Sequence, residues 1–175
     1  QKDAKNNVKV GQQGIYKATK VNGNWTNIQA LPINSTKYSV GNPSLSKDGK
    51  TLYFASNMPG GKGETDIWKI SITNNSYGKP ENLGPKVNTS GRETFPCIAD
   101  DNVLYFASSG RQGLGGLDIF KLDLNDKDAE VLNLDMVISI APISLPRPGR
   151  GVDLQVRLSA PLHGNSLAII IFSHC

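Results

Sequence analysis

The sequence contains few of the residues that build disulfide frameworks or metal centres. Cysteine occurs twice, at Cys97 and Cys175, and histidine twice, at His163 and His174. Two cysteines do not make a disulfide framework, and no cluster of cysteine and histidine has the spacing of a zinc site. We therefore expect neither structural disulfides nor a cofactor.

Long apolar runs and clusters of one charge are missing as well. The longest apolar run, 167–172, has six residues, whereas a membrane-spanning helix needs about 20. Residues 1–135 carry 16 Lys and Arg against 14 Asp and Glu, interspersed along the chain. Binding to nucleic acid needs a basic stripe, which this pattern does not form. The sequence predicts no membrane span and no nucleic-acid partner.

What the sequence does contain is an internal repeat with a period of 52 residues. Residues 51–70 read TLYFASNMPGGKGETDIWKI, and residues 103–122 read VLYFASSGRQGLGGLDIFKL. Both contain Leu-Tyr-Phe-Ala-Ser, then a Gly-rich loop, then Asp-Ile-aromatic-Lys. An earlier segment, IYKATK at 15–20, matches the last part of the unit. Insertions and deletions between the copies fall in loops, as a repeated structural unit predicts.

Each unit contains four short runs with β-strand character. In the best-formed unit these are 42–46, 51–56, 66–72 and a weak run around 77–83. The run 51–56 is almost wholly apolar, which is typical of a strand covered on both faces, whereas 66–72 alternates apolar and polar residues. No segment has a convincing helical period. The sequence therefore predicts an all-β repeat protein.

The motif "NPSLSKDGKTLYFASN" followed by "DIWKI" resembles the WD40-like β-propeller repeat of the TolB type. Residues 43–72 match that pattern almost throughout, residues 96–124 match it with Asp-Asp-Asn in place of Asp-Gly-Lys, and 15–31 match its second half. The resemblance implies a partial β-propeller made of four-stranded antiparallel blades. Closed propellers have at least four blades, so open blade edges and faces predict self-association or membership of a larger protein.

The resemblance divides the chain into three parts. They are an N-terminal lead-in (1–14), a partial propeller (15–134) and an atypical tail (135–175). The propeller consists of a half blade (15–31), a full blade (42–83) and most of a further blade (95–134).

The tail differs from the rest in composition. It contains no lysine, and its only asparagine is Asn165. It is either a divergent closing segment or a frame-shifted, non-native end, and we favour the second interpretation.

The Gly-rich forms "GGKGETDIW" and "GLGGLDIFKL" resemble copies found in large OmpA-family proteins of the Gram-negative envelope. That likeness implies a location in the periplasm or on the periplasmic side of the outer membrane, with a protein of the cell envelope as partner. Some members of that family are linked to gliding or type IX secretion. Their peptidoglycan-binding domain has no counterpart in this chain, so its function is not carried over.

Most of the acidic residues have structural interpretations. Asp48 and Gly49 resemble the Asp box of sialidase-type propellers, where the aspartate most simply caps a hairpin turn. The segment 100–102, Asp-Asp-Asn, offers oxygen ligands for Ca²⁺ but lacks the alternating pattern of a dedicated loop. Because they recur within the repeat, we interpret the following residues as structural: Asp48, Gly49, Asp66, Trp68, Asp101, Asp118 and Phe120.

No catalytic constellation is visible in the sequence. His163 and Ser166 do not form a Gly-x-Ser-x-Gly motif, no acid partners them, and they lie in the atypical tail. The Gly-rich loops do not open helices, so they are not phosphate cradles. We expect a protein that is not an enzyme.

Long connections offer the best candidate binding surface. The segments 57–65 and 109–117 are predicted to emerge at the same end as 34–41 and 84–94, and long loops on a rigid scaffold commonly bind partners. The candidate binding residues are Asn57, Lys62, Arg92, Glu93, Arg111 and Gln112. Ordinary solvated loops are the simpler interpretation of the same residues.

The sequence thus favours a non-catalytic β-propeller scaffold for protein–protein interaction in the bacterial envelope. The alternative is the propeller part of an envelope glycan or peptide hydrolase whose catalytic residues lie elsewhere. A weaker alternative is a purely structural spacer.

Overall fold

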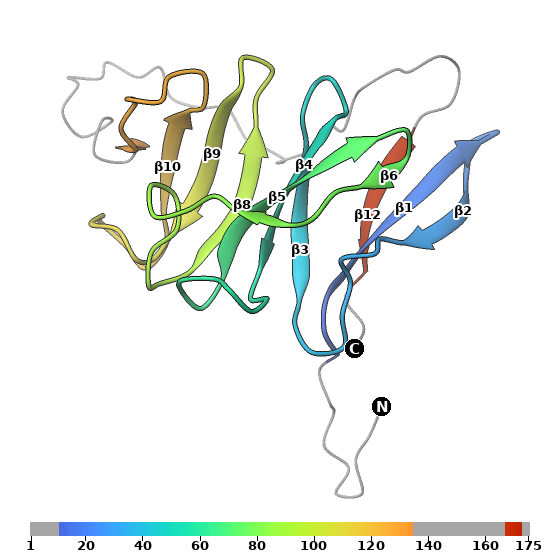
Figure 1. Cartoon of the computed structure of the whole chain (residues 1–175), viewed down its shortest axis with the longest axis horizontal. Helices are drawn as coiled ribbons and strands as arrows, with labels where there is room; N and C mark the ends of the chain where they lie inside the picture. Colours follow the sequence, from blue (N-terminus) through green and yellow to red (C-terminus); the bar gives the residue numbers. More distant parts are fainter. Residues whose placement is uncertain (1–10, 135–166, 173–175) are drawn as a thin grey trace, which may run out of the picture.

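The structure, a computed structural model, describes residues 11–134 and 167–172. The elements of this part are all β-strands (Figure 1). They are β1 (Gly14–Val21), β2 (Asn24–Ala30), β3 (Val40–Leu45), β4 (Thr51–Ser56), β5 (Asp66–Thr73), β6 (Ser76–Tyr77), β7 (Glu81–Asn82), β8 (Glu93–Ile98), β9 (Val103–Ser108), β10 (Asp118–Asp123), β11 (Leu132–Asn133) and β12 (Leu167–Phe172).

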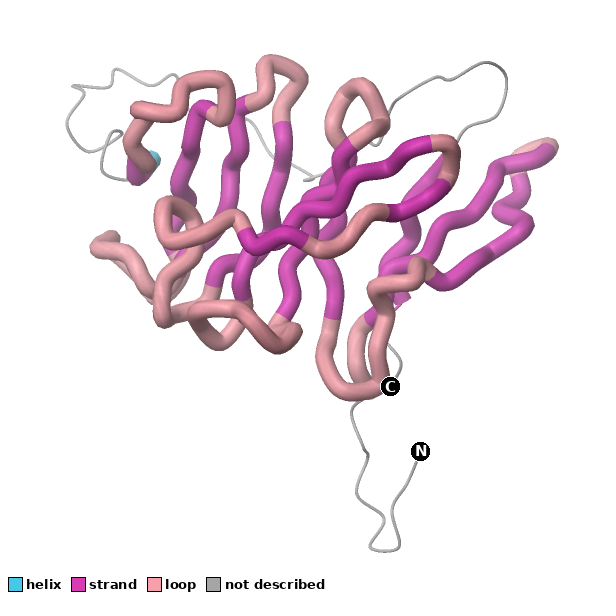
Figure 2. The backbone as a smooth tube through the Cα atoms, in the orientation of Figure 1, coloured by secondary structure: helices cyan, strands magenta, loops and turns pink. Residues whose placement is uncertain are grey.

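The strands form three antiparallel sheets that stand side by side (Figures 1 and 2). The first sheet has the order β12-β1-β2, and the third has the order β11-β10-β9-β8. The second sheet runs β3-β4-β5-β6, and β7 also pairs with β5. The predicted all-β fold with antiparallel pairing is confirmed. The weak fourth run of the second sheet is divided into two strands of two residues each.

The first sheet contains a strand that the repeat did not predict. β12 pairs antiparallel with β1, and Ile15 lies opposite Ile171. In the second sheet, the repeat-equivalent Ile67 lies opposite Ala55 of β4. β12 therefore takes the place beside β1 that β4 takes beside β5. It comes from the segment that we separated as an atypical tail; residues 135–166 and 173–175 of that tail, and 1–10 of the lead-in, lie outside the described residues. The tail's origin stays a prediction.

The first hydrophobic core lies between the first and second sheets. β4 contributes alternate side chains, Leu52 and Phe54, to this core and turns Tyr53 and Ala55 toward the third sheet. Burial on both faces explains why the run 51–56 is almost wholly apolar. The buried residues of the first core are Ile15, Leu31, Ile33, Val40, Leu52, Phe54, Met58, Trp68 and Ile70.

The second core lies between the second and third sheets and repeats the pattern. Ile67 of β5 is fully buried in this core, whereas the neighbouring Trp68 belongs to the first. Phe106 and Phe120 stack within it, with their ring centroids 5.9 Å apart. The buried residues are Tyr53, Ala55, Ile67, Val87, Leu104, Phe106, Phe120 and Leu122.

The first strands of the second and third sheets each contain an irregularity before a proline. The register of β3 shifts between Gly41 and Ser44, and that of β8 shifts between Thr94 and Cys97. Asn42, the residue before Pro43, has φ of 49°, and Phe95, the residue before Pro96, has φ of 51°. Asparagine tolerates this left-handed conformation, whereas an aromatic residue is strained in it.

The same two strands also hold the sheets together through polar side chains. The Thr94 hydroxyl donates to Asn42 Oδ1 at 3.0 Å. The backbone N–H of Ile98 donates to Ser44 Oγ at 2.9 Å. The two sheets are therefore joined by hydrogen bonds at their first strands and by apolar packing across their faces.

Replacing Phe95 by asparagine should stabilise the protein. The ring is 60% exposed, so its loss removes little buried area, while asparagine relieves left-handed strain of about 1 kcal/mol. We expect a rise of that size in the free energy of unfolding, measured by urea denaturation. The reciprocal change, Asn42→Phe, should lower it by at least as much, because the bond from Thr94 is lost too. Equal stability of both variants would contradict this account.

Candidate functional site

The long connections come together at one end of the molecule. We call this the loop end and define it as residues 34–41, 57–65, 84–94 and 109–117; it forms the lower edge of Figure 1, opposite the tight turns. Glu64 N donates to Gly91 O at 2.8 Å, and Ser109 N donates to Arg92 O at 3.0 Å. Ser39 N donates to Asn57 Oδ1 at 2.8 Å. Each loop is thus bonded to its neighbour.

Glycine lets three of these loops touch backbone to backbone. A Cβ atom at Gly63 would collide with the carbonyl oxygen of Gly91. A Cβ atom at Gly91 would lie 2.7 Å from Gly110 Cα, closer than real Cβ contacts come. Glycine at positions 63 and 91 is therefore a packing requirement.

Two repeat-equivalent aspartates anchor the loops that precede β5 and β10. The carboxylate of Asp66, which is 1% exposed, accepts from Lys62 N at 2.5 Å and Gly63 N at 3.0 Å, and from Asn82 Nδ2 at 2.7 Å. Asp118, 3% exposed, accepts from Leu114 N and Gly115 N, both at 3.1 Å. Several N–H donors satisfy each buried carboxylate, so both residues hold the loop backbone in place.

A pair of asparagines repeats in the same way. The side chain of Asn88 accepts from Ile67 N at 2.7 Å and donates to Ile67 O at 2.9 Å. Asn34 makes the same two bonds to Ile15, at 2.9 and 2.8 Å. Each asparagine thereby ties the loop before one sheet to a central strand of the preceding sheet. Sequence reasoning missed both residues, although their spacing of 54, close to the repeat period, was a usable signal.

Glu93 lies inside the loop end rather than on it. Its side chain is fully buried, and its carboxylate accepts from Thr89 N at 2.7 Å and from the hydroxyls of Thr89 and Ser108, both at 2.6 Å. These bonds occupy the group that we had assigned to a binding surface. Through these contacts Glu93 holds the backbone of segment 89–93 in place.

Arg111 connects the loop end to the second core. The guanidinium lies 5.8 Å from the ring centroids of both Phe106 and Phe120. Its Nη2 donates to the carbonyl oxygens of Lys86 and Val87. Burial lowers the pKa of this guanidinium, and the Glu93 carboxylate acts in the opposite direction. The buried Nε has no hydrogen-bond partner among the described residues.

The remaining candidates are exposed. Asn57, Lys62, Arg92 and Gln112 all present their side chains to solvent at the loop end. Arg92 forms an ion pair with Glu64, at 3.4 Å between Nη2 and Oε2. Both side chains of this pair are more than half exposed, so the pair contributes at most about 1 kcal/mol to stability.

The tight turns at the opposite end are built by their own acidic residues. Asp48 Oδ1 accepts from Ser46 Oγ at 2.6 Å and from Lys50 N at 3.0 Å, and these bonds hold the pKa of Asp48 below its ordinary value. Gly49 has φ of 70°. Asp101 Oδ1 accepts from Val103 N at 3.3 Å. These contacts are those of hairpin caps.

In residues 11–134 and 167–172, no group of three or more His, Cys, Asp or Glu side chains is placed to hold a metal ion. His163, Ser166 and His174 lie outside the described residues. The same part of the chain has no helix long and apolar enough to cross a membrane. Two hollows, of about 340 and 310 Å³, are lined by the third sheet and its neighbouring loops.

Comparison with known proteins gives matches among solved structures only. No family model matches the sequence, and no curated protein matches it. Among solved structures, the chain is similar to the crystal structure of TolB from Acinetobacter baumannii, with a TM-score of 0.40 and 18% sequence identity. The match covers 64% of this chain and 24% of the TolB chain.

Replacing Asn88 by alanine should destabilise the protein strongly. The change leaves the buried N–H of Ile67 without a partner, at a cost of about 2–3 kcal/mol in the free energy of unfolding. Asn88→Asp keeps that acceptor but sets a carboxylate against two oxygen acceptors, Ile67 O and Asn82 Oδ1, so it should cost at least as much. Thermal and urea denaturation measure both variants. Gln29→Ala on exposed β2 is the control, expected within about 0.5 kcal/mol of the parent.

Arg111→Ala should lower stability by about 2 kcal/mol through loss of the contacts with two rings and two carbonyl groups. Arg111→Lys should recover only part of this, since an ammonium group does not reproduce the fork of the guanidinium. Gln112→Ala, at the exposed neighbouring position, should leave the melting temperature unchanged. An unchanged melting temperature for Arg111→Ala would show that its packing contributes nothing.

Proposed function

We propose that this chain is a non-catalytic, partial β-propeller segment that binds a protein partner in the bacterial cell envelope through its loop end. The three sheets would be blades, the second and third each built from one 52-residue repeat. The observation that carries the proposal is the fixed backbone of the loop end. Buried Asp66, Asp118, Asn88 and Glu93 hold it, and exposed polar side chains point outward from it.

Rigidity favours binding because little conformational entropy is lost when a partner docks. The loop backbone is already fixed by hydrogen bonds and by the contact between Gly63 and Gly91. The exposed side chains differ between loops, while the buried anchors repeat. Such a surface can specify one partner without disturbing the scaffold.

Charge indicates what the partner presents. The exposed ionic side chains of the loop end are Lys37, Lys62, Lys86 and Arg92, against Glu64 alone. A partner surface rich in carboxylates complements these cations, and charge complementarity favours encounter and register.

The carboxylates of the described loop end are not placed to act as a general acid or base. A general acid or base must reach its substrate. Asp66, Glu93 and Asp118 are buried and hydrogen-bonded to the chain itself, and Glu64 pairs with Arg92. The envelope location rests on the sequence resemblance to OmpA-family copies of the repeat.

The proposal is tested by photo-crosslinking in cells. A photoreactive amino acid replaces Lys62 or Gln112 at the loop end, or Lys47 at the tight turns, in the full chain exported to the periplasm of a Gram-negative host. We expect a discrete crosslinked protein from positions 62 and 112 and none from position 47. Lys47 is a matched control because it is equally charged and its side chain is 69% exposed.

Arg92→Ala should then reduce the crosslink yield several-fold without lowering the melting temperature, because the Arg92–Glu64 pair is exposed and contributes little to stability. Arg92→Glu should reduce the yield further. Equal crosslinking from both ends, or none from positions 62 and 112, would overturn the proposal.

A further inference from the structure

The outer face of the third sheet, defined by Val103, Tyr105, Ala107, Ile119 and Lys121, is a copy of a face that is buried elsewhere in the molecule. In the second sheet, the equivalent Tyr53, Ala55 and Ile67 are 7%, 4% and 0% exposed, because the third sheet covers them. In the third sheet, Ile119 is 49% exposed, and Tyr105 and Ala107 are only partly buried. Within the described part of the chain, residues that the repeat keeps for sheet-on-sheet packing are thus not covered by another sheet.

One further apolar side chain extends this face. Leu132, on the neighbouring β11, is 47% exposed. An apolar surface of this kind, rimmed by polar residues, is typical of an interaction site. At the equivalent positions of the second sheet the covering surface is an apolar sheet face, and we infer that the face of the third sheet fits a surface of the same chemistry.

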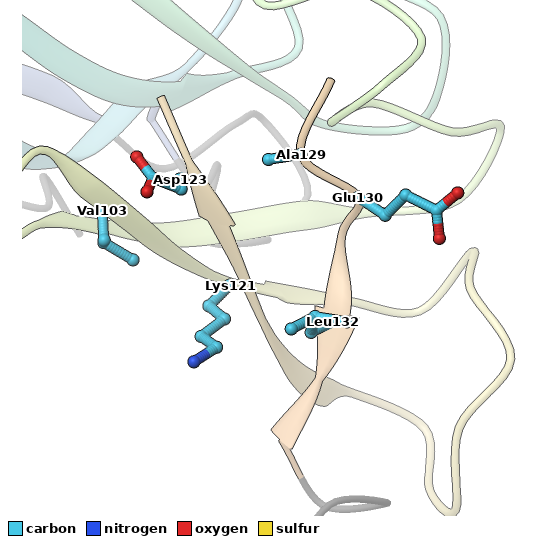
Figure 3. A pocket seen from close by; sticks show the side chains of 6 residues that line it. All are labelled: Val103, Lys121, Asp123, Ala129, Glu130 and Leu132. Carbon is cyan, nitrogen blue, oxygen red and sulfur yellow. The ribbon is translucent and has the colours of Figure 1, made fainter. Parts of the chain in front are cut away.

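A hollow of about 340 Å³ opens on the same face (Figure 3). It is lined by Val103, Lys121, Asp123, Ala129, Glu130 and Leu132. Lys121 and Glu130 are not in an ion pair with any described residue. In the second sheet, by contrast, the equivalent Lys69 pairs with Glu81 at 3.3 Å. The face therefore carries an apolar ridge, a hollow, an unpaired cation and carboxylates.

These features complement one another. A two-fold symmetric interface places a residue i of one copy against j of the other and j against i. On this face, the ridge of one copy can pack into the hollow of the other, and the cation of one copy can pair with the carboxylates of the other. One surface therefore supplies both halves of each contact. The leucine and aromatic faces that would otherwise fit, carried by β4 and β9, are already covered within the chain.

We propose that the outer face of the third sheet binds the same face of a second copy of this chain. Ile119 of each copy then packs toward the hollow of the other, and each Lys121 faces the partner's carboxylates. This surface is distinct from the loop end, so the inference does not depend on the proposed function.

Sedimentation equilibrium of the full chain across a dilution series tests the proposal. We expect a monomer–dimer equilibrium that weakens as salt is raised. Ile119→Lys should weaken the dimer at least about tenfold. Ile28→Lys is the matched control: Ile28 is 52% exposed on β2, at the far side of the molecule, and its replacement should leave the equilibrium unchanged.

Charge reversal supplies a second readout. Lys121→Glu should weaken association, and adding Asp123→Lys and Glu130→Lys to it should restore association. A monomer at every concentration would overturn the proposal, as would a dimer that Ile28→Lys dissociates as well as Ile119→Lys. A monomer whose melting temperature falls with Ile119→Lys would also overturn it, because another part of the chain would then cover the face. Arg92→Ala should not affect any of these measurements.

Discussion

The arrangement of the loops depends on polar side chains that form hydrogen bonds with backbone groups in the interior of the loop end. Asp66 and Asp118 gather the N–H groups of the loop that precedes their own strand, while Asn34 and Asn88 reach back to the preceding sheet. Leaving such groups unpaired in the interior costs more than the bonds themselves contribute. The loops therefore have one conformation in which every anchor is satisfied, and the apolar cores alone would not select it.

Packing explains the rest of the fold. The second sheet, which lies between the other two, has two different apolar faces, and β4 supplies alternate residues to both. The same five residues, Leu-Tyr-Phe-Ala-Ser, have different surroundings in β9, where the second sheet covers one face and no described sheet covers the other. The burial of these side chains is thus decided by which sheets lie next to the strand and not by the sequence of the strand.

The repeat in the sequence was sufficient to predict the strands over 42–83 and 95–124, the antiparallel pairing and the end at which the long loops gather, because period and alternation are local signals. It was insufficient for β12, since no local pattern says which distant segment will pair with β1. It also misjudged the surroundings of Glu93, because a charged residue in a loop reads as exposed until its partners Thr89 and Ser108 are placed around it. Contacts between side chains that are distant in sequence produce no periodic pattern in the sequence.

The contact between Gly63 and Gly91 has a consequence for how this architecture varies over evolutionary time. Where two loops meet through bare backbone, the spacing between neighbouring units is set by the width of the peptide chain and not by the volume of any side chain. Duplicated units then keep the same separation while the tips of their loops diverge freely. Sequence variation at this end is therefore confined to the loop tips. A substitution at either glycine would disturb the packing of two neighbouring units.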